Sequence, residues 1–154
     1  MPNFALTDPE RRLLRALHDR GIRFLVVGLG AALIEGAPVA TLDIDLWFAR
    51  IDDDRIPLAA ADAGGFWVTG FGVQPPAFGG DGLDRLDVVL TVHGLDAFDR
   101  EYAGGIEREI DGVPVRVLPL ERVITSKRAT NRAKDRAALP ILEATLVARD
   151  APPD

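Results

Sequence analysis

Two carboxylates that stand two residues apart in an apolar, alternating segment are the side chains of this chain best suited to do chemistry. Residues 40–48 read ATLDIDLWF, which places Asp43 and Asp45 at alternate positions. Side chains along a strand alternate between its faces, so both carboxylates would share one face, with Cα atoms about 6.6 Å apart. Such a pair can bind one divalent cation or a close pair of cations. Without a cation the two charges repel each other, which raises at least one pKa.

A second interpretation of this pair stays open. A strand with one solvated face has the same alternation, and its aspartates are then ordinary surface residues. Asp is nevertheless depleted in strands, and two on one face with no adjacent Lys or Arg are unfavourable. The spacing alone therefore leaves a metal site and a solvated strand face as alternatives.

Length and composition indicate one globular domain. The chain has 154 residues, of which 47% are hydrophobic and 27% charged. We expect residues 1–150 to form this domain and residues 151–154 to be a disordered tail. The chain has no cysteine, which excludes disulfides and thiolate chemistry and favours a reducing compartment. Residues 1–4 do not resemble the start of a signal peptide, and no apolar run approaches the ~20 residues of a membrane span, so we expect a cytoplasmic protein.

Charge is distributed unevenly along the chain. The net charge is −6 and the pI is near 4.9, so no overall positive field recruits nucleic acid. Residues 122–136 nevertheless contain six basic residues and only one acidic residue, Asp135. Such a segment is typical of a phosphate contact, or of a solvated helix face.

The pattern of apolar, glycine and proline residues predicts an α/β (α+β) fold, in which helices flank a mixed sheet. Asp8 is expected to cap a first helix that ends at Gly21. A type I′ turn is expected at Asp111-Gly112, and a helical C-terminal part is expected to break or kink near Pro140. The remaining expected elements are strands at 23–27, 42–48, 66–69, 86–92, 106–110 and 113–118, helices at 31–35 and 53–63, and a long loop at 70–82.

Two further features fall near the aspartate pair in this arrangement. A turn formed by Gly28, Leu29 and Gly30 begins a helix, so its backbone N–H groups can hold a phosphate. Such a glycine turn is also common between a strand and a helix that bind no ligand. Asp87 lies on a later strand whose other face is apolar. Three carboxylates on adjacent strands would hold two Mg²⁺ ions.

At this point the chain resembles the nucleotidyltransferase superfamily, in particular the small single-domain members related to the minimal nucleotidyltransferases and the AbiEii-like group. The resemblance covers residues 24–143 and rests on four motifs in the expected order. These are LVVG at 25–28 with a later Gly36, TLDIDL at 41–46, RLDVV at 85–89 and SKRATNRAKD at 126–135.

The resemblance implies an activity and a role for each motif. Asp43 and Asp45 would bind the Mg²⁺ ions, and Asp87, the third metal-binding carboxylate, would activate an acceptor hydroxyl. A nucleoside monophosphate would then pass from a nucleoside triphosphate (NTP) to a protein, an RNA end or a small molecule. Lys127 would contact the triphosphate, and Lys134 and Asp135 match a second pair near the nucleotide. A partner protein, as in a toxin–antitoxin pair, is part of the same expectation.

Two departures from the family pattern favour an alternative function. Leu29 stands where the family has Gly or Ser, and its branched side chain obstructs phosphate approach unless Gly30 compensates. Val39 stands where the family often has a basic residue. The alternative is a degenerate, catalytically weak domain of the same fold that binds a nucleotide or a partner. A third possibility is an interaction domain whose aspartates are surface charges only.

Overall fold

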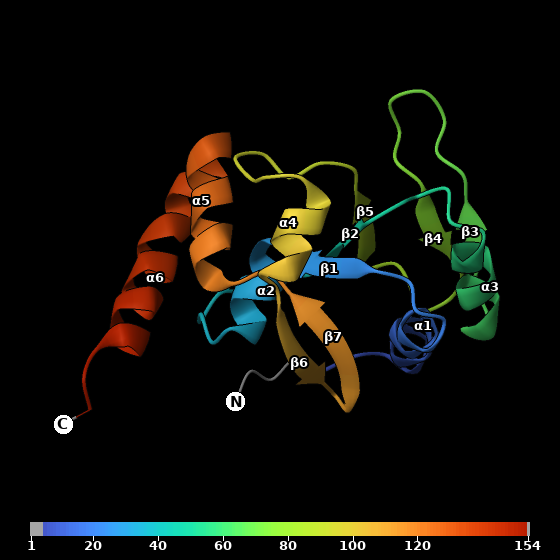
Figure 1. Ribbon diagram of the computed structural model, residues 1–154, viewed down its shortest axis with the longest axis horizontal. Coiled ribbons are helices and arrows are strands. Elements are labelled where there is room, and N and C mark those ends of the chain that lie inside the picture. The colour runs from blue at the N-terminus through green and yellow to red at the C-terminus, as the bar shows by residue number, and fades with distance from the viewer. Residues whose placement is uncertain (1–4, 154) are drawn as a thin grey trace.

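Six helices and seven strands are present in the residues that the computed structural model describes, 5–153 (Figure 1). The helices are α1 (Asp8–Asp19), α2 (Gly28–Ile34), α3 (Arg55–Asp62), α4 (Phe98–Ala103), α5 (Leu120–Thr130) and α6 (Ala133–Asp150). The strands are β1 (Phe24–Val27), β2 (Ile44–Phe48), β3 (Phe66–Val68), β4 (Ala77–Gly79), β5 (Leu86–Val89), β6 (Ile106–Ile110) and β7 (Val113–Val117). Residues 151–153 of the expected tail follow α6 outside any helix or strand, and Asp154 lies outside the described residues.

Five of the strands form one mixed sheet in the order β5-β2-β1-β7-β6. β1 pairs antiparallel with β2 and parallel with β7, while β2 pairs parallel with β5. Strands β3 and β4 form a separate two-stranded sheet. β1, at the centre of the large sheet, is buried along its whole length, as expected for a strand covered on both faces. The predicted mixed sheet flanked by helices is therefore confirmed.

The N-cap of helix α1 lies one residue before the expected cap. Thr7 is the N-cap: its hydroxyl accepts from the Glu10 N–H at 3.1 Å, and the Glu10 carboxylate accepts from the Thr7 N–H at 2.8 Å. This capping box satisfies two backbone donors at once. The prediction that Asp8 caps the helix is wrong, because Asp8 is already its first residue.

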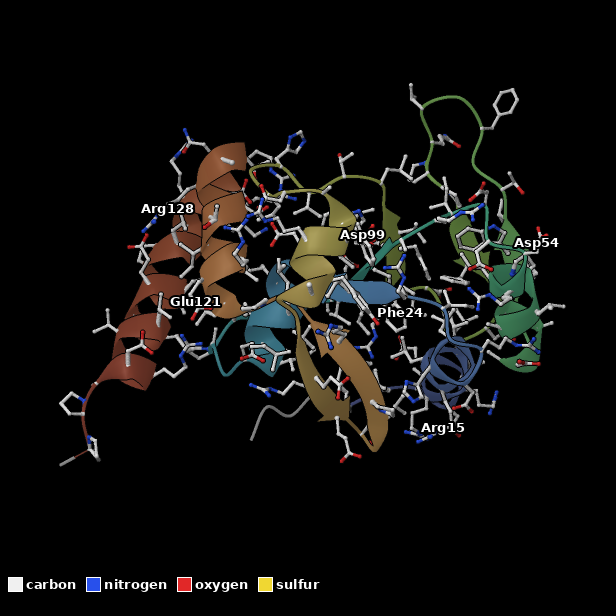
Figure 2. All side chains as sticks on the ribbon, in the orientation of Figure 1. Arg15, Phe24, Asp54, Asp99, Glu121 and Arg128 are labelled. Carbon is white, nitrogen blue, oxygen red and sulfur yellow. The ribbon has the colours of Figure 1, made fainter. Side chains whose placement is uncertain are left out.

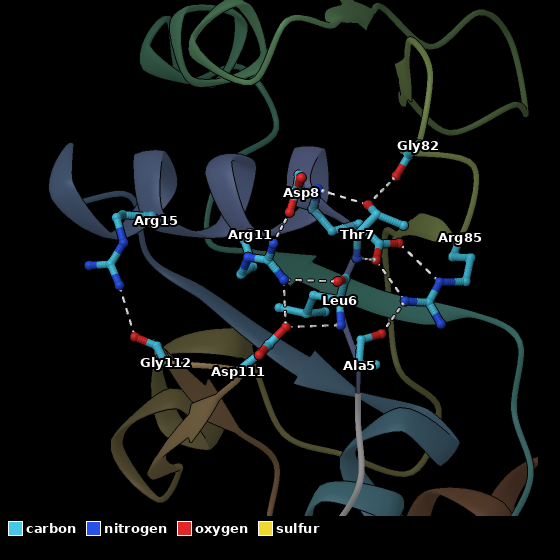
Figure 3. A network of polar contacts seen from close by, with 11 residues as sticks. Ala5, Leu6, Thr7, Asp8, Arg11, Arg15, Gly82, Arg85, Asp111 and Gly112 are labelled. Carbon is cyan, nitrogen blue, oxygen red and sulfur yellow. Dashed lines mark hydrogen bonds and ion pairs between the residues drawn. The ribbon is translucent and has the colours of Figure 1, made fainter.

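The N-terminal end of α1 is fastened to the loop that leads into β5 (Figure 3). Arg85 donates to both oxygens of Glu10, at 2.6 and 3.0 Å, and to the carbonyl of Ala5 at 2.9 Å. Thr7 also donates through its hydroxyl to the Gly82 carbonyl at 2.8 Å. The Glu10 side chain is fully buried, so the ion pair replaces the water that this carboxylate loses.

Several elements differ from their expected ranges, and the expected strand 86–92 ends at Val89. The expected strand 42–48 begins only at Ile44, so Asp43 precedes β2. The expected loop 70–82 contains β4, which pairs with β3. An isolated bridge between Phe71 and Gln74 lies in the loop that joins these two strands. Helix α4 was not predicted, because its six residues are too few to establish a helical period.

The C-terminal helical region breaks at Asn131 and not at Pro140. Asn131 ends α5 in the left-handed conformation (φ 51°), which Asn tolerates better than most residues. Pro140 lies inside the continuous 18-residue helix α6, where it removes one backbone hydrogen bond. The predicted type I′ turn is confirmed, because Asp111 and Gly112 both have positive φ, 52° and 81°.

Candidate functional site

The site is built where β1 passes into α2. Val27 ends β1 directly opposite Asp45 in the β1–β2 register, and Gly28 follows as the first residue of α2. Gly28 has φ 68°, and a Cβ atom at this position would lie 2.6 Å from Oδ2 of Asp45. Both the backbone conformation and the closeness of the carboxylate therefore require glycine here. The expected glycine turn is thus part of the helix itself.

The three aspartates of the sequence prediction converge at the neighbouring strands. Asp45 of β2 and Asp87 of β5 are directly paired in the parallel register, so they lie side by side. Asp43 lies two residues before Asp45. The Ile44 N–H donates to the Arg85 carbonyl at 2.7 Å, which ties the start of β2 to the start of β5.

Burial and like charge act together on these carboxylates. The pKa of Asp45 is raised by burial first, and then by the negative charges of Asp87 and Asp43; Lys127 and Lys134 oppose this rise. The pKa of Asp87 is raised by burial and by Asp43. A cation bound between these side chains would relieve this repulsion.

Lys127 and Asp135, which lie eight residues apart in the 126–135 motif, are in contact. Lys127 Nζ lies 3.3 Å from Asp135 Oδ1, and Arg132 Nε lies 2.8 Å from Oδ2. Asp135 is fully buried and also accepts from the Arg132 backbone N–H at the start of α6. These hydrogen bonds, to Arg132 above all, hold the pKa of Asp135 well below its usual range. Asp135 is thus an anchor between α5 and α6.

Lys134 differs from Lys127. It is exposed, and it has no ion pair within residues 5–153. Its charge nevertheless reaches the carboxylates, because it lowers the pKa of Asp45. Lys134 can therefore bind a negatively charged ligand without first breaking an ion pair with a carboxylate.

These side chains surround a cavity of about 600 Å³, a size suited to a nucleotide. All of the predicted site residues except Gly30 line it. The predicted residues in the lining are Gly28, Leu29, Asp43, Asp45, Asp87, Lys127, Lys134 and Asp135.

Gly30 and Val39 lie elsewhere. Gly30 is buried, and a Cβ atom on it would meet the Asp43 carbonyl at 3.6 Å, so its role is close packing of α2 against the start of β2. Val39 packs partly buried against the core and does not line the cavity. Leu29 does line it, beside Gly28.

Six polar residues of the lining were not among the predicted site residues: Thr41, Thr91, His93, Ser126, Thr130 and Arg132. Thr41 exchanges hydrogen bonds with the backbone of Asp43, at 3.2 Å each. On α5, Ser126 and Lys127 each lie about one helical turn before Thr130, so the three side chains share one face of the helix. This spacing could have identified Ser126 and Thr130 from the sequence.

The donor set fits Mg²⁺, although the side chains do not form a closed coordination site. Three carboxylates supply hard oxygen ligands of the kind that Mg²⁺ binds. Among residues 5–153, no group of three or more His, Cys, Asp or Glu side chains is gathered closely enough to hold an ion. Asp43 and Asp87 are exposed, so both can change rotamer around a cation.

Comparisons with known proteins give matches among solved structures. No family model matches the chain, and no curated protein matches it. It is similar to the crystal structure of ANT(2″)-Ia in complex with adenylyl-2″-tobramycin, with 19% identity and a TM-score of 0.58 over 90% of this chain and 87% of that chain. The solution structure of the antibiotic-resistance factor ANT(2″)-Ia matches with 18% identity and a TM-score of 0.58, over 90% and 82% of the two chains. At this identity the likeness is one of fold.

No helix within the described residues is both long enough and apolar enough to cross a membrane.

Proposed function

Because this chain has a nucleotidyltransferase-like fold, we propose that it transfers a nucleoside monophosphate from an NTP to a hydroxyl acceptor. One observation carries the proposal. Asp45 and Asp87 are paired on adjacent strands beside Asp43 and the glycine start of α2, and they share a cavity with Lys127 and Lys134. Carboxylates opposite lysines suit a metal-bound triphosphate.

Each residue has a proposed role in the transfer. Asp43, Asp45 and Asp87 would hold one or two Mg²⁺ ions, which supply charge stabilisation at the attacking and leaving oxygens. Asp87 accepts the proton of the acceptor hydroxyl, whose oxygen forms a bond to the α-phosphorus as the bond to pyrophosphate breaks.

The triphosphate would lie toward the helices. Lys134 contacts it directly, and Lys127 and Arg132 contribute positive charge while they remain bonded to Asp135. The backbone at Gly28 borders the same cavity without a side chain, which allows close approach of a phosphate.

Calorimetry tests the proposal before any acceptor is known. The wild-type protein is titrated with Mg²⁺ and each non-hydrolysable NTP, in parallel with Asp43→Asn/Asp45→Asn. We expect binding in the wild type and its loss in the double variant. Asp19→Asn, an exposed change on α1, is the matched control and should bind normally. Equal binding by the double variant would refute the assignment of the metal site.

A degenerate nucleotide- or partner-binding domain is the alternative. Two observations favour it: the Leu29 side chain lines the cavity beside Gly28, and Lys127 is already paired with Asp135. If Leu29 is the obstruction, Leu29→Gly should give nucleotide binding that the wild type lacks. Nucleotide binding by the wild type with no gain in Leu29→Gly would exclude this explanation.

Three classes of acceptor are included in the proposal: small molecules, RNA ends and proteins. The ANT(2″)-Ia complex contains adenylyl-2″-tobramycin, a small molecule that carries an adenylyl group. Small molecules, RNA ends and proteins are therefore separate arms of an activity screen with α-labelled NTPs. A toxin–antitoxin role is part of this proposal because of the family resemblance. A cytoplasmic location is part of it because the chain has no cysteine.

A further inference from the structure

Exposed large apolar side chains gather at one end of the molecule. Ten such side chains are exposed among the described residues, and seven of them lie between residues 51 and 90. A contiguous group of this kind is typical of a surface that meets a partner, whereas scattered single residues are not. The seven are Ile51, Leu58, Phe66, Val68, Phe71, Val73 and Leu90.

The β3–β4 hairpin carries most of this surface. Its inner face is anchored, because Trp67 and Phe78 pack against each other and against Phe48 of β2. Its tip is not, because Phe71 is 86% exposed and Val73 is 99% exposed. Figure 1 shows the tip loop rising beyond the strands, at the end of the molecule opposite α5 and α6. The hairpin is thus anchored at its base, while its apolar tip is exposed to solvent.

A groove of about 460 Å³ lies at the base of this hairpin. Its apolar lining includes Trp67 and Leu90, and its acidic lining is the run Asp52, Asp53 and Asp54, with no Lys or Arg among the lining residues. Figure 2 labels Asp54 beside α3.

Two of these carboxylates are partly neutralised from outside the groove. Arg50 pairs with Asp52 at 3.1 Å and Arg55 pairs with Asp53 at 2.6 Å. Asp54 makes no cap hydrogen bond and no ion pair within residues 5–153. The groove thus combines an apolar floor with uncompensated negative charge.

We propose that this groove and the hairpin tip dock a basic segment of a partner protein, in which an apolar side chain is flanked by Lys or Arg. The apolar side chain would contact Trp67 and Phe71, and the basic residues would meet Asp54 and its neighbours. A second copy of this chain fits less well, because a two-fold contact would bring the acidic runs of both copies together.

The groove and the candidate site are lined by neighbouring residues at the end of β5. Leu90 lines the groove, whereas Val89 and Thr91 on either side of it line the cavity that holds Asp87. Successive side chains of an extended segment point to opposite sides, so a docked protein would lie close to the proposed site along the chain but on the other side of this segment. The docking does not rest on the proposed function.

The test uses an array of nine-residue synthetic peptides with a central Leu, Phe or Trp flanked by Lys or Arg. Binding to the full chain is measured by calorimetry at two salt concentrations. Reference arrays replace the basic residues by Glu, or the central residue by Ser. We expect saturable binding by members of the first array only, weakened at least tenfold by Phe71→Ser, Val73→Ser or Asp54→Asn. Val147→Ser, a change of an exposed valine on α6, is the matched control and should bind normally.

Several results would overturn the proposal. These are no saturable binding by any basic peptide, equal binding by the acidic or Ser-centred peptides, or equal binding by the hairpin variants. A dimer in sedimentation experiments that Phe71→Ser converts to monomer would assign the surface to a second copy instead. Asp43→Asn/Asp45→Asn should keep full peptide affinity, so a failure of the proposed enzymatic function would leave the docking result interpretable.

Discussion

Burial and like charge both disfavour the ionised form of Asp45, which is the form that the proposed metal site requires. Asp45 is half-buried, faces Asp43 and Asp87, and has a raised pKa for these reasons. A carboxyl whose folded pKa is raised contributes stability at low pH and loses it as the pH rises through that pKa. At neutral pH without a cation, the ionised site is therefore a source of instability.

We predict that Asp45→Asn raises the melting temperature at pH 7 in the presence of EDTA, by about 2–4 °C for each kcal/mol gained. Mg²⁺ at 100 times its Kd should stabilise the wild type by about 2.7 kcal/mol and the variant by much less. Thermal unfolding with and without Mg²⁺ measures both effects, with Asp19→Asn as control. A variant that melts below the wild type in EDTA would contradict the assigned repulsion.

Gly28 provides a second test at this scale. Gly28→Ala imposes a positive φ on a residue with a Cβ, which costs about 1–2 kcal/mol, and it pushes against Asp45. Gly36→Ala is the matched control, because Gly36 also has positive φ (99°) but a Cβ there meets nothing within 4 Å. In urea unfolding both variants should lose stability. In calorimetry only Gly28→Ala should lose Mg²⁺ binding, and equal binding by both would refute the contact.

At the scale of elements, α1 and β5 are coupled through one buried ion pair. Glu10 holds the Arg85 side chain, and the Arg85 carbonyl accepts from the N–H of Ile44, which lies between Asp43 and Asp45. The first turn of α1 thereby supports the alignment of β2 with β5, although it contributes no side chain to the cavity.

We predict that Glu10→Gln destabilises the protein by about 2 kcal/mol, because Arg85 loses a charged partner while remaining partly solvated. Hydrogen exchange of the Ile44 amide should accelerate more than exchange elsewhere in the sheet. Arg11→Gln breaks a different contact of α1, to Asp111 at 2.7 Å, and should leave the Ile44 amide protected. Uniform acceleration across the sheet in Glu10→Gln would show a global effect only.

For the whole molecule, acid stability is set by carboxylates other than the metal-site candidates. Arg55 lowers the pKa of Asp53 to about 2, and Arg132 and Lys127 hold the pKa of Asp135 well below its usual range. A lowered folded pKa contributes stability above the ordinary value of 3.8 that is lost as the pH falls through the folded pKa. Asp45 acts in the opposite direction.

We predict a melting temperature that falls steeply between about pH 4 and pH 2. Asp135→Asn should lower stability at pH 7 by about 1–3 kcal/mol, because Lys127 and Arg132 lose their charged partner, and should flatten this acid dependence. Melting curves across this pH range, with Asp19→Asn as control, provide the measurement. An unchanged acid slope in Asp135→Asn would contradict the role of its ion pairs.

The elements of this fold were predictable where short-range patterns determine them. The leucine stripe of α1, the buried strand β1 and the Asp111-Gly112 turn follow from periodicity and turn chemistry. The position of the break between the C-terminal helices was not predictable in this way. Pro140 removes one backbone hydrogen bond, but packing of the surrounding helix, as at the buried Leu142, offsets that loss. Asn131 supplies the break through its own backbone conformation.

The sequence by itself determined the candidate carboxylates, because their spacing and the order of the strands are local properties of the chain. The tertiary structure alone decided how the charges are paired. The packing of α5 against α6 joins Lys127 to the buried Asp135 and leaves Lys134 toward the cavity. Ion pairing depends on distances of a few ångströms between residues brought together by helix packing, and no spacing along the chain encodes those distances.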